Sequence, residues 1–218
     1  DSQTYSNDFD SLAEGVIPDG WTNSATNTST VFVKAALKPL PLVDLNNALL
    51  VQDSSEKIGP VRATRSFDEA DGVTVEFDYM LASDGLFEAN YFNIYSKVET
   101  TDAGKILVGV FPNTDLDGNY TGTATLKYYN GSGWFATTKN DVTPGEWYRI
   151  KIEIEPGETT ARLYLDGSKL ADVWARSSIP TVDRFSVESG SVEGKGDLFY
   201  KVNQRISVIL IIVLFKHF

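Results

Sequence analysis

The segment from Gly145 to Trp174 constrains the fold most, because it predicts three antiparallel strands in a row. Over residues 148–155 apolar and charged side chains alternate, and this period of two gives one strand an apolar face and a charged face. Pro156-Gly157 ends that strand. A second alternating run follows, and Asp166-Gly167 then supplies the positive-φ pair that a tight hairpin turn needs. A patterned, exposed sheet of this kind is a platform for binding.

Similar turn signals recur along the rest of the chain. Pairs rich in Gly, Pro, Asn and Asp separate short β-branched and aromatic runs at intervals of roughly ten residues, a spacing typical of sandwiches and jelly rolls. Long helical patterns are nearly absent. We therefore predict an all-β jelly-roll sandwich of two antiparallel sheets, formed by one domain over residues 1–203. The predicted strands are 4–10, 30–37, 47–53, 60–67, 72–82, 87–98, 105–111, 121–129, 132–138, 146–155, 160–166, 168–174, 182–188 and 196–202.

Residues 204–218 form an apolar C-terminal tail that differs in composition from the rest. Its core, ISVILIIVLF over 206–215, is too short to cross a bilayer as a helix, which needs about 20 residues. Three interpretations stay open. The run is a buried closing strand, or an exchanged edge strand through which residues 206–215 self-associate, or a sequence artefact or short membrane-associating end.

Composition excludes several classes of function. A net charge of −11 makes nucleic acid a poor partner, because phosphate binding needs a basic surface. The absence of cysteine removes disulfides, thiolate nucleophiles and cysteine metal sites. The single histidine, His217, is almost terminal, which argues against a histidine base or a Ser-His-Asp triad. The single methionine is Met80, so we expect a cut chain or a removed signal peptide, and an extracellular or cell-surface location without a membrane partner.

Three segments resemble secreted bacterial domains of the concanavalin A-like lectin/glucanase superfamily. NDFDSLAEGVIPDGW resembles their first strand and loop, RATRSFDEADGVTVEFDYM their next paired strands, and GEWYRIKIEIEPGETTARLYLDGSKLADV their laminin-G-like meander. The likeness covers residues 5 to about 200. It implies a jelly roll, and a carbohydrate-binding module such as those of the levan-binding family 66, or an appendage of a polysaccharide lyase or glycosidase.

The end of the domain departs from that pattern. Relatives close with a strand similar to LYIDNV, whereas this chain has DLFYKVN at 197–203. Lys201 and Val202 precede Asn203 in place of the expected acid, which argues against a terminal calcium site of the family type.

Two other places could hold a structural calcium ion. Asn113, Asp115, Asp117 and Asn119 supply oxygens at alternate positions with a glycine in the sixth place, similar to half of a calcium loop. The expected twelfth-position glutamate is absent, and an ordinary Asx-rich turn is the alternative. The second place is the pair Asp8 and Asp10, which share one side of a predicted strand.

Catalysis, if present, would use carboxylate or tyrosine chemistry. Glu76 and Asp78 share a strand face about 7 Å apart, as the acid and nucleophile of glycoside hydrolysis could. Glucanase relatives add a third acid on this strand, where Met80 and Leu81 stand here. A solvent-exposed outer face is the alternative interpretation.

Carbohydrate binding asks for aromatic rings to stack on a sugar and planar polar groups to meet its hydroxyls. Tyr91, Asn93 and Tyr95 share one strand face, while Tyr128 and Trp134 flank a predicted Asn130-Gly131 turn. Arg62 could add a fork of donors. We assign Trp147 and Trp174 to packing.

The leading hypothesis is a secreted, non-catalytic domain that binds a polysaccharide or other glycan through a concave sheet face and rim loops. One alternative is a polysaccharide lyase or glycosidase that uses Glu76 and Asp78. The other is a structural subunit of an extracellular fibre or surface layer, joined through the apolar tail.

Overall fold

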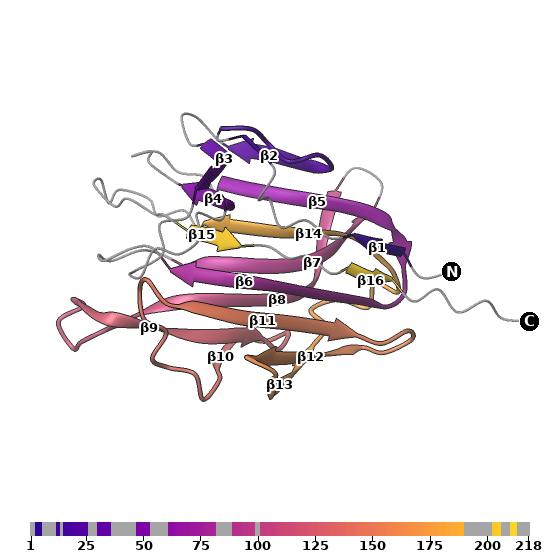
Figure 1. The fold of residues 1–218 in the computed structure, drawn as a ribbon. Coiled ribbons are helices and arrows are strands. Elements are labelled where there is room, and N and C mark those ends of the chain that lie inside the picture. Colours follow the sequence, from indigo (N-terminus) through magenta and orange to yellow (C-terminus); the bar gives the residue numbers. More distant parts are fainter. Residues whose placement is uncertain are drawn as a thin grey trace, which may run out of the picture.

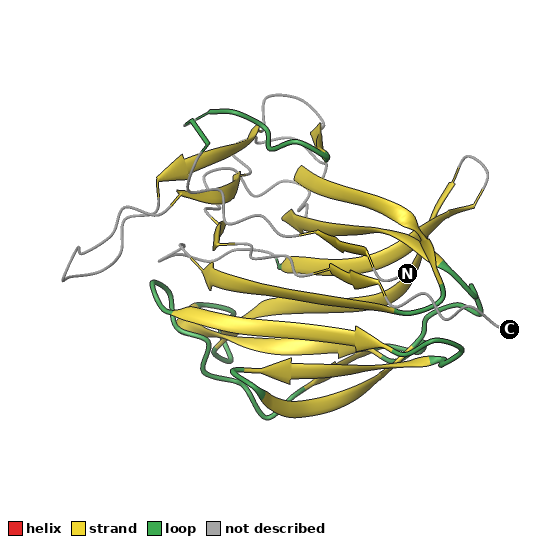
Figure 2. Cartoon of the chain, turned by 45° about the vertical axis from the view of Figure 1, so that its right-hand side comes forward, coloured by secondary structure: helices red, strands yellow, loops and turns green. Residues whose placement is uncertain are grey.

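The structure is a computed structural model of the 218-residue chain. It describes residues 3–5, 12–13, 15–25, 30–35, 47–52, 61–81, 89–98, 101–189, 202–205 and 210–212. Within these residues the regular structure consists of strands, with no helix (Figure 2). It follows that none of the described residues belong to a helix capable of crossing a membrane.

Two antiparallel sheets pack face to face (Figure 1). One has the order β13-β12-β11-β6-β15-β4-β3, and β16 joins it beside β6 and pairs with β1. Its strands are β1 (Gln3–Tyr5), β3 (Thr30–Ala35), β4 (Asn47–Gln52), β6 (Val73–Leu81), β11 (Trp147–Ile154), β12 (Thr160–Leu165), β13 (Ser168–Trp174), β15 (Val202–Arg205) and β16 (Leu210–Ile212).

The second sheet has the order β10-β9-β8-β7-β14-β5-β2. Its strands are β2 (Trp21–Ala25), β5 (Val61–Ala70), β7 (Asn90–Val98), β8 (Thr101–Thr114), β9 (Tyr120–Tyr129), β10 (Trp134–Ala136) and β14 (Val182–Ser189). The all-β, two-sheet antiparallel sandwich expected from the sequence is confirmed.

The three-stranded meander expected between Gly145 and Trp174 forms as predicted. Strand β11 pairs with β12, with Ile152 opposite Leu163, and β12 pairs with β13. Between β12 and β13, Asp166 and Gly167 have φ values of 48° and 83°, the two positive values of a type I′ turn. The apolar positions of β11 and β12 are buried, so this hairpin covers one end of the core.

The core lies between the two sheets. The Phe77 ring, from β6, has its centroid 4.8 Å from that of Phe92 on β7 and 5.3 Å from that of Phe185 on β14. All three side chains are fully buried. Since alternate residues of a strand face opposite ways, their neighbours in sequence lie on the outer faces of the two sheets.

Two strands are absent from the predicted set, β2 and β16, and the second lies in the tail for which a closing strand was one of the open interpretations. Strand β2 follows Pro18-Asp19-Gly20 and carries only Trp21 as a large apolar residue, so its sequence lacks a clear alternation. Its register is set by pairing with β5, which places Trp21 opposite Arg65. A tertiary contact therefore defines this strand, which a local pattern cannot reveal.

Part of the apolar tail pairs within the chain. Leu210–Ile212 lies opposite Gln3–Tyr5, and Ile211 also lies opposite Thr74 of β6. Strand β15 pairs with both β4 and β6. Residues 206–209 and 213–218 lie outside the described part of the chain, so self-association and the division at residue 203 stay predictions.

Candidate functional site

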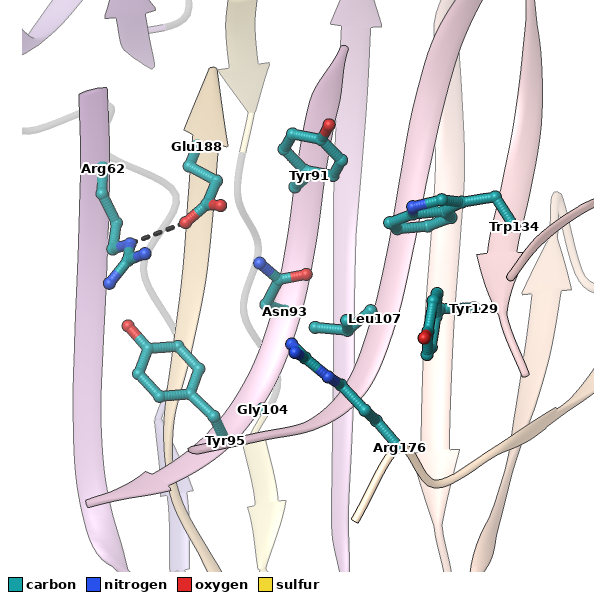
Figure 3. A pocket seen from close by; sticks show the side chains of 10 residues that line it. All are labelled: Arg62, Tyr91, Asn93, Tyr95, Gly104, Leu107, Tyr129, Trp134, Arg176 and Glu188. Carbon is teal, nitrogen blue, oxygen red and sulfur yellow. Dashed lines mark hydrogen bonds and ion pairs between the residues drawn. The ribbon is translucent and has the colours of Figure 1, made fainter. Parts of the chain in front are cut away.

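A pocket of about 400 Å³ opens on the face of the seven-stranded sheet that is turned away from the core (Figure 3). Its volume lies in the range typical of small-ligand sites. The lining residues come from six adjacent strands and the segment after β13: Arg62, Tyr91, Asn93, Tyr95, Gly104, Leu107, Tyr129, Trp134, Arg176 and Glu188.

Strand alternation brings these side chains together. On β7, Phe92 and Ile94 are fully buried in the core, so Tyr91, Asn93 and Tyr95 face outward. The register then places Glu188 of β14 beside Tyr91 on one side and Arg62 of β5 on the other. These cross-strand neighbours form a continuous row across the sheet.

One end of the pocket is polar. Arg62 Nε donates to Glu188 Oε2 at 2.6 Å, and the Glu188 side chain is only 11% exposed. Burial raises the pKa of the Glu188 carboxyl, although the Arg62 cation and a hydrogen bond with Asn93 act in the opposite direction. The Tyr95 hydroxyl shares a hydrogen bond of 3.3 Å with Thr64, and the Arg62 guanidinium lies 5.7 Å from the Tyr95 ring centroid. The polar groups are thus held by one another before any ligand arrives.

Asn93 occupies the middle of the pocket, between its polar and aromatic ends (Figure 3). Its side chain hydrogen-bonds with Glu188. Its Oδ1 atom is buried and has no hydrogen-bond partner among the described residues. A buried acceptor without a donor costs free energy, and a bound hydroxyl would relieve that cost.

The other end of the pocket is aromatic. The Trp134 ring centroid lies 5.6 Å from that of Tyr91, with an interplanar angle of 39°, and 5.8 Å from that of Tyr129. The Phe111 ring packs against Trp134, with a distance of 4.8 Å between the ring centroids. The guanidinium of Arg176 lies 5.8 Å from the Tyr129 centroid. These rings form an apolar wall of the kind that stacks on the C–H face of a sugar.

Gly109 allows the aromatic wall to lie close to the sheet. A Cβ atom at this position would lie 2.9 Å from the Phe111 ring and 3.1 Å from that of Tyr91. Any larger residue would therefore displace the rings that flank Trp134.

Five of the six residues predicted from the sequence to bind a ligand line this one pocket: Arg62, Tyr91, Asn93, Tyr95 and Trp134. Tyr128 does not line it. Its side chain points to the opposite face of β9, packs against the core and stacks on Phe135 with centroids 6.2 Å apart. The adjacent Tyr129 takes the place in the pocket, because neighbouring residues of a strand face opposite ways.

Glu188 and Arg176 were missed for different reasons. Glu188 pairs with a residue 126 positions away, which only the register of β5 and β14 reveals. Arg176 follows β13, and its backbone N–H donates to the Lys105 carbonyl oxygen at 2.8 Å. No local pattern marks such a residue.

The carboxylate pair lies on the other sheet. Arg149 Nε and Nη2 donate to the two Asp78 oxygens at 2.8 and 2.9 Å, and Arg149 Nε lies 3.8 Å from a Glu76 oxygen. Neither acid lines the pocket. Both form part of a charged outer face, the alternative considered from the sequence.

The predicted calcium loop is an Asx turn. Asp115 Oδ1 accepts hydrogen bonds from the Asp117 and Asn119 backbone N–H groups at 2.9 and 2.8 Å, and the hydrogen bonds from Asn119 lower the Asp115 pKa. Asn113 instead bonds to Thr123, Thr125 and the Asn140 carbonyl oxygen.

Among the described residues, no three His, Cys, Asp or Glu side chains gather in a metal-binding cluster. Asp8 and Asp10 lie outside the described residues. Calcium therefore stays a prediction at both places.

Packing was the wrong expectation for Trp174, which is 60% exposed. It ends β13, which is the edge strand of its sheet, and the preceding Val173 faces the core instead. Trp147 is partly buried, with its Nε1 atom enclosed.

Comparison with solved structures defines the class of fold, which is the concanavalin A-like jelly roll. A sialidase superposes with a TM-score of 0.70 at 11% identity over 95% of this chain, which spans only 18% of the sialidase chain. Carbohydrate-binding module CBM66 from Bacillus subtilis gives 0.51 at 15% identity, over 88% of this chain and 95% of the module. Bacillus licheniformis beta-glucanase gives 0.56 at 12% identity, over 97% and 98% of the two chains. No family model and no curated protein matches the sequence.

Proposed function

We propose that this chain is a non-catalytic carbohydrate-binding domain that takes a glycan into the pocket of the seven-stranded sheet. The observation that carries the proposal is the joint arrangement of the Trp134 wall and the Arg62–Glu188 pair around Asn93. Rings stack on the apolar face of a sugar, while planar polar groups bond to its hydroxyls. We further propose that it acts outside the cell, where polysaccharides are found.

The names of the structural neighbours support this class of ligand. They include a carbohydrate-binding module and a beta-glucanase, each matched over most of its own length. At 15% and 12% identity these neighbours share the fold alone with this chain. The proposal of carbohydrate binding therefore rests on the residues of the pocket.

Binding is favoured over catalysis by the carboxylates that the pocket offers. Hydrolysis of a glycoside generally needs two carboxyl groups that flank the scissile bond. Among the described residues that line the pocket, Glu188 is the only acid, and Arg62 already holds it. Glu76 and Asp78 lie on the other sheet beside Arg149.

Two neighbouring aromatics on β10 provide the test. Trp134 faces the pocket, whereas Phe135 stacks on Tyr128 on the opposite face and is 45% exposed. A glycan array should identify a ligand. Trp134→Ala should then weaken its binding about tenfold or more, because a buried aromatic anchor contributes about 1–2 kcal/mol or more.

Phe135→Ala serves as the matched control and should leave the affinity within about twofold. Equal losses in both variants would place the ligand elsewhere. Absence of binding to every glycan on the array would refute the proposal. Turnover of a bound glycan that Glu76→Gln abolishes would instead support the enzyme hypothesis.

A further inference from the structure

We infer that the pocket selects acidic sugars, and that Arg176 is the residue that binds the sugar carboxylate. The inference rests on the proposed function, because it names the class of glycan that the same pocket would take.

The two arginines of the pocket differ in how their charge is used. Arg62 forms an ion pair with Glu188 at 2.6 Å. Arg176 is exposed, and among the described residues no acid lies within ion-pair distance of it. Its guanidinium lies 5.8 Å from the Tyr129 ring centroid. An aromatic ring is not a carboxylate or carbonyl acceptor, so this contact leaves the guanidinium N–H groups available for a carboxylate.

Backbone hydrogen bonds hold the main chain around Arg176, so the position from which its side chain extends is defined. Ala175 N–H donates to the Thr159 carbonyl oxygen and Arg176 N–H to that of Lys105, both at 2.8 Å. Figure 3 shows the guanidinium reaching from the lower edge of the pocket toward Asn93. A ligand between them would contact both groups.

The charge of the pocket is opposite to that of the molecule. Its described lining holds two arginines and one glutamate, an excess of one positive charge, in a chain of net charge −11. At physiological salt the Debye length is about 8 Å, so exposed acids elsewhere on the surface are largely screened from the pocket. A neutral sugar would gain nothing from this local excess, whereas a uronate would.

Asn93 gives the acidic sugar an orientation. Its unpartnered Oδ1 atom repels a carboxylate but accepts a hydrogen bond from a hydroxyl. The acid group would therefore lie against Arg176, with a ring hydroxyl against Asn93 and the ring itself beside Trp134.

The test compares acidic polysaccharides with their carboxyl-reduced forms, which keep the same ring and linkage. Polygalacturonate, alginate and hyaluronan are each titrated with the full chain by calorimetry, before and after reduction. At least one acid form should bind about tenfold tighter than its reduced form, the size expected for one charge-assisted contact at an exposed arginine. Arg176→Gln should abolish that difference by weakening the acid form about tenfold more than the reduced form. Arg176→Lys should restore part of it.

Arg162→Gln is the matched control, because it removes the same charge from the other sheet, where Arg162 pairs with Glu153 and Glu155. It should preserve the selectivity. Equal or tighter binding of the reduced forms would overturn the inference while the proposed function stands. Binding of a sulfated neutral galactan with the same Arg176 dependence would replace carboxylate selectivity with general anion binding. Failure of acidic and neutral glycans alike would refute both proposals.

Discussion

Phe77 and Glu76 are adjacent on β6 and test which face of the strand meets the core. Phe77 is fully buried, and its ring lies between those of Phe92 and Phe185 from the opposite sheet. Truncation of a buried Phe to Ala costs about 3–5 kcal/mol, and the two close ring pairs place Phe77→Ala in the upper half of that range. For a domain of this size, a loss of about 4 kcal/mol lowers Tm by about 8–16 °C.

Glu76→Ala is the control for that experiment. The Glu76 side chain is 28% exposed and lies 3.8 Å from Arg149, so its removal should cost less than about 1 kcal/mol. Thermal unfolding followed by circular dichroism measures both variants. A one-residue change of register exchanges the two faces of a strand. Equal Tm losses in the two variants, or a larger loss for Glu76→Ala, would therefore refute this assignment of faces.

Three further predictions concern a turn, an acid and an ion pair. Gly167→Ala should lower the free energy of unfolding in urea by about 1 kcal/mol, because Gly167 has a φ of 83° even though there is space for a Cβ atom. Gly133→Ala is the control and should be nearly neutral, because Gly133 has no positive φ. Burial holds the pKa of the Glu188 carboxyl above its ordinary 4.5, so the folded chain keeps a proton that the unfolded chain loses. The stability should therefore fall as the pH rises from about 4.5 through the folded pKa. Glu188→Gln should remove this component from the dependence of Tm on pH. Arg149→Ala should cost less than about 1 kcal/mol despite two hydrogen bonds to Asp78, since the Arg149 side chain is 53% exposed; a loss above about 2 kcal/mol in chemical unfolding would contradict this.

Strand alternation explains why much of the site could be predicted. The run of residues 90–95 fixes which side chains share a face, so Tyr91, Asn93 and Tyr95 could be grouped without knowledge of the fold. Near a turn the same reasoning is less secure. An error of one position in the strand exchanges Tyr128 for Tyr129, and only the pairing with β10 and β8 settles which of them faces outward.

The polar half of the pocket depends on long-range register. Arg62 and Glu188 meet because β5 pairs with β14, and the shared neighbour β7 brings Tyr91 beside them. Nothing within either segment specifies this pairing. The meander, by contrast, was predictable in detail because its three strands are consecutive and its turns are short.

The two ends of the pocket rest on different supports. Trp134 belongs to β10, three residues that pair only with β9 at the margin of the sheet, whereas Glu188 sits on a strand flanked by partners on both sides. A substitution at Trp134 would affect a short edge strand, whereas a substitution at Glu188 would remove the carboxylate that pairs with Arg62 on two inner strands of the sheet. A change of ring at β10 would therefore alter the proposed binding wall at the edge of the sheet, whereas a change at Glu188 would alter an ion pair within the sheet.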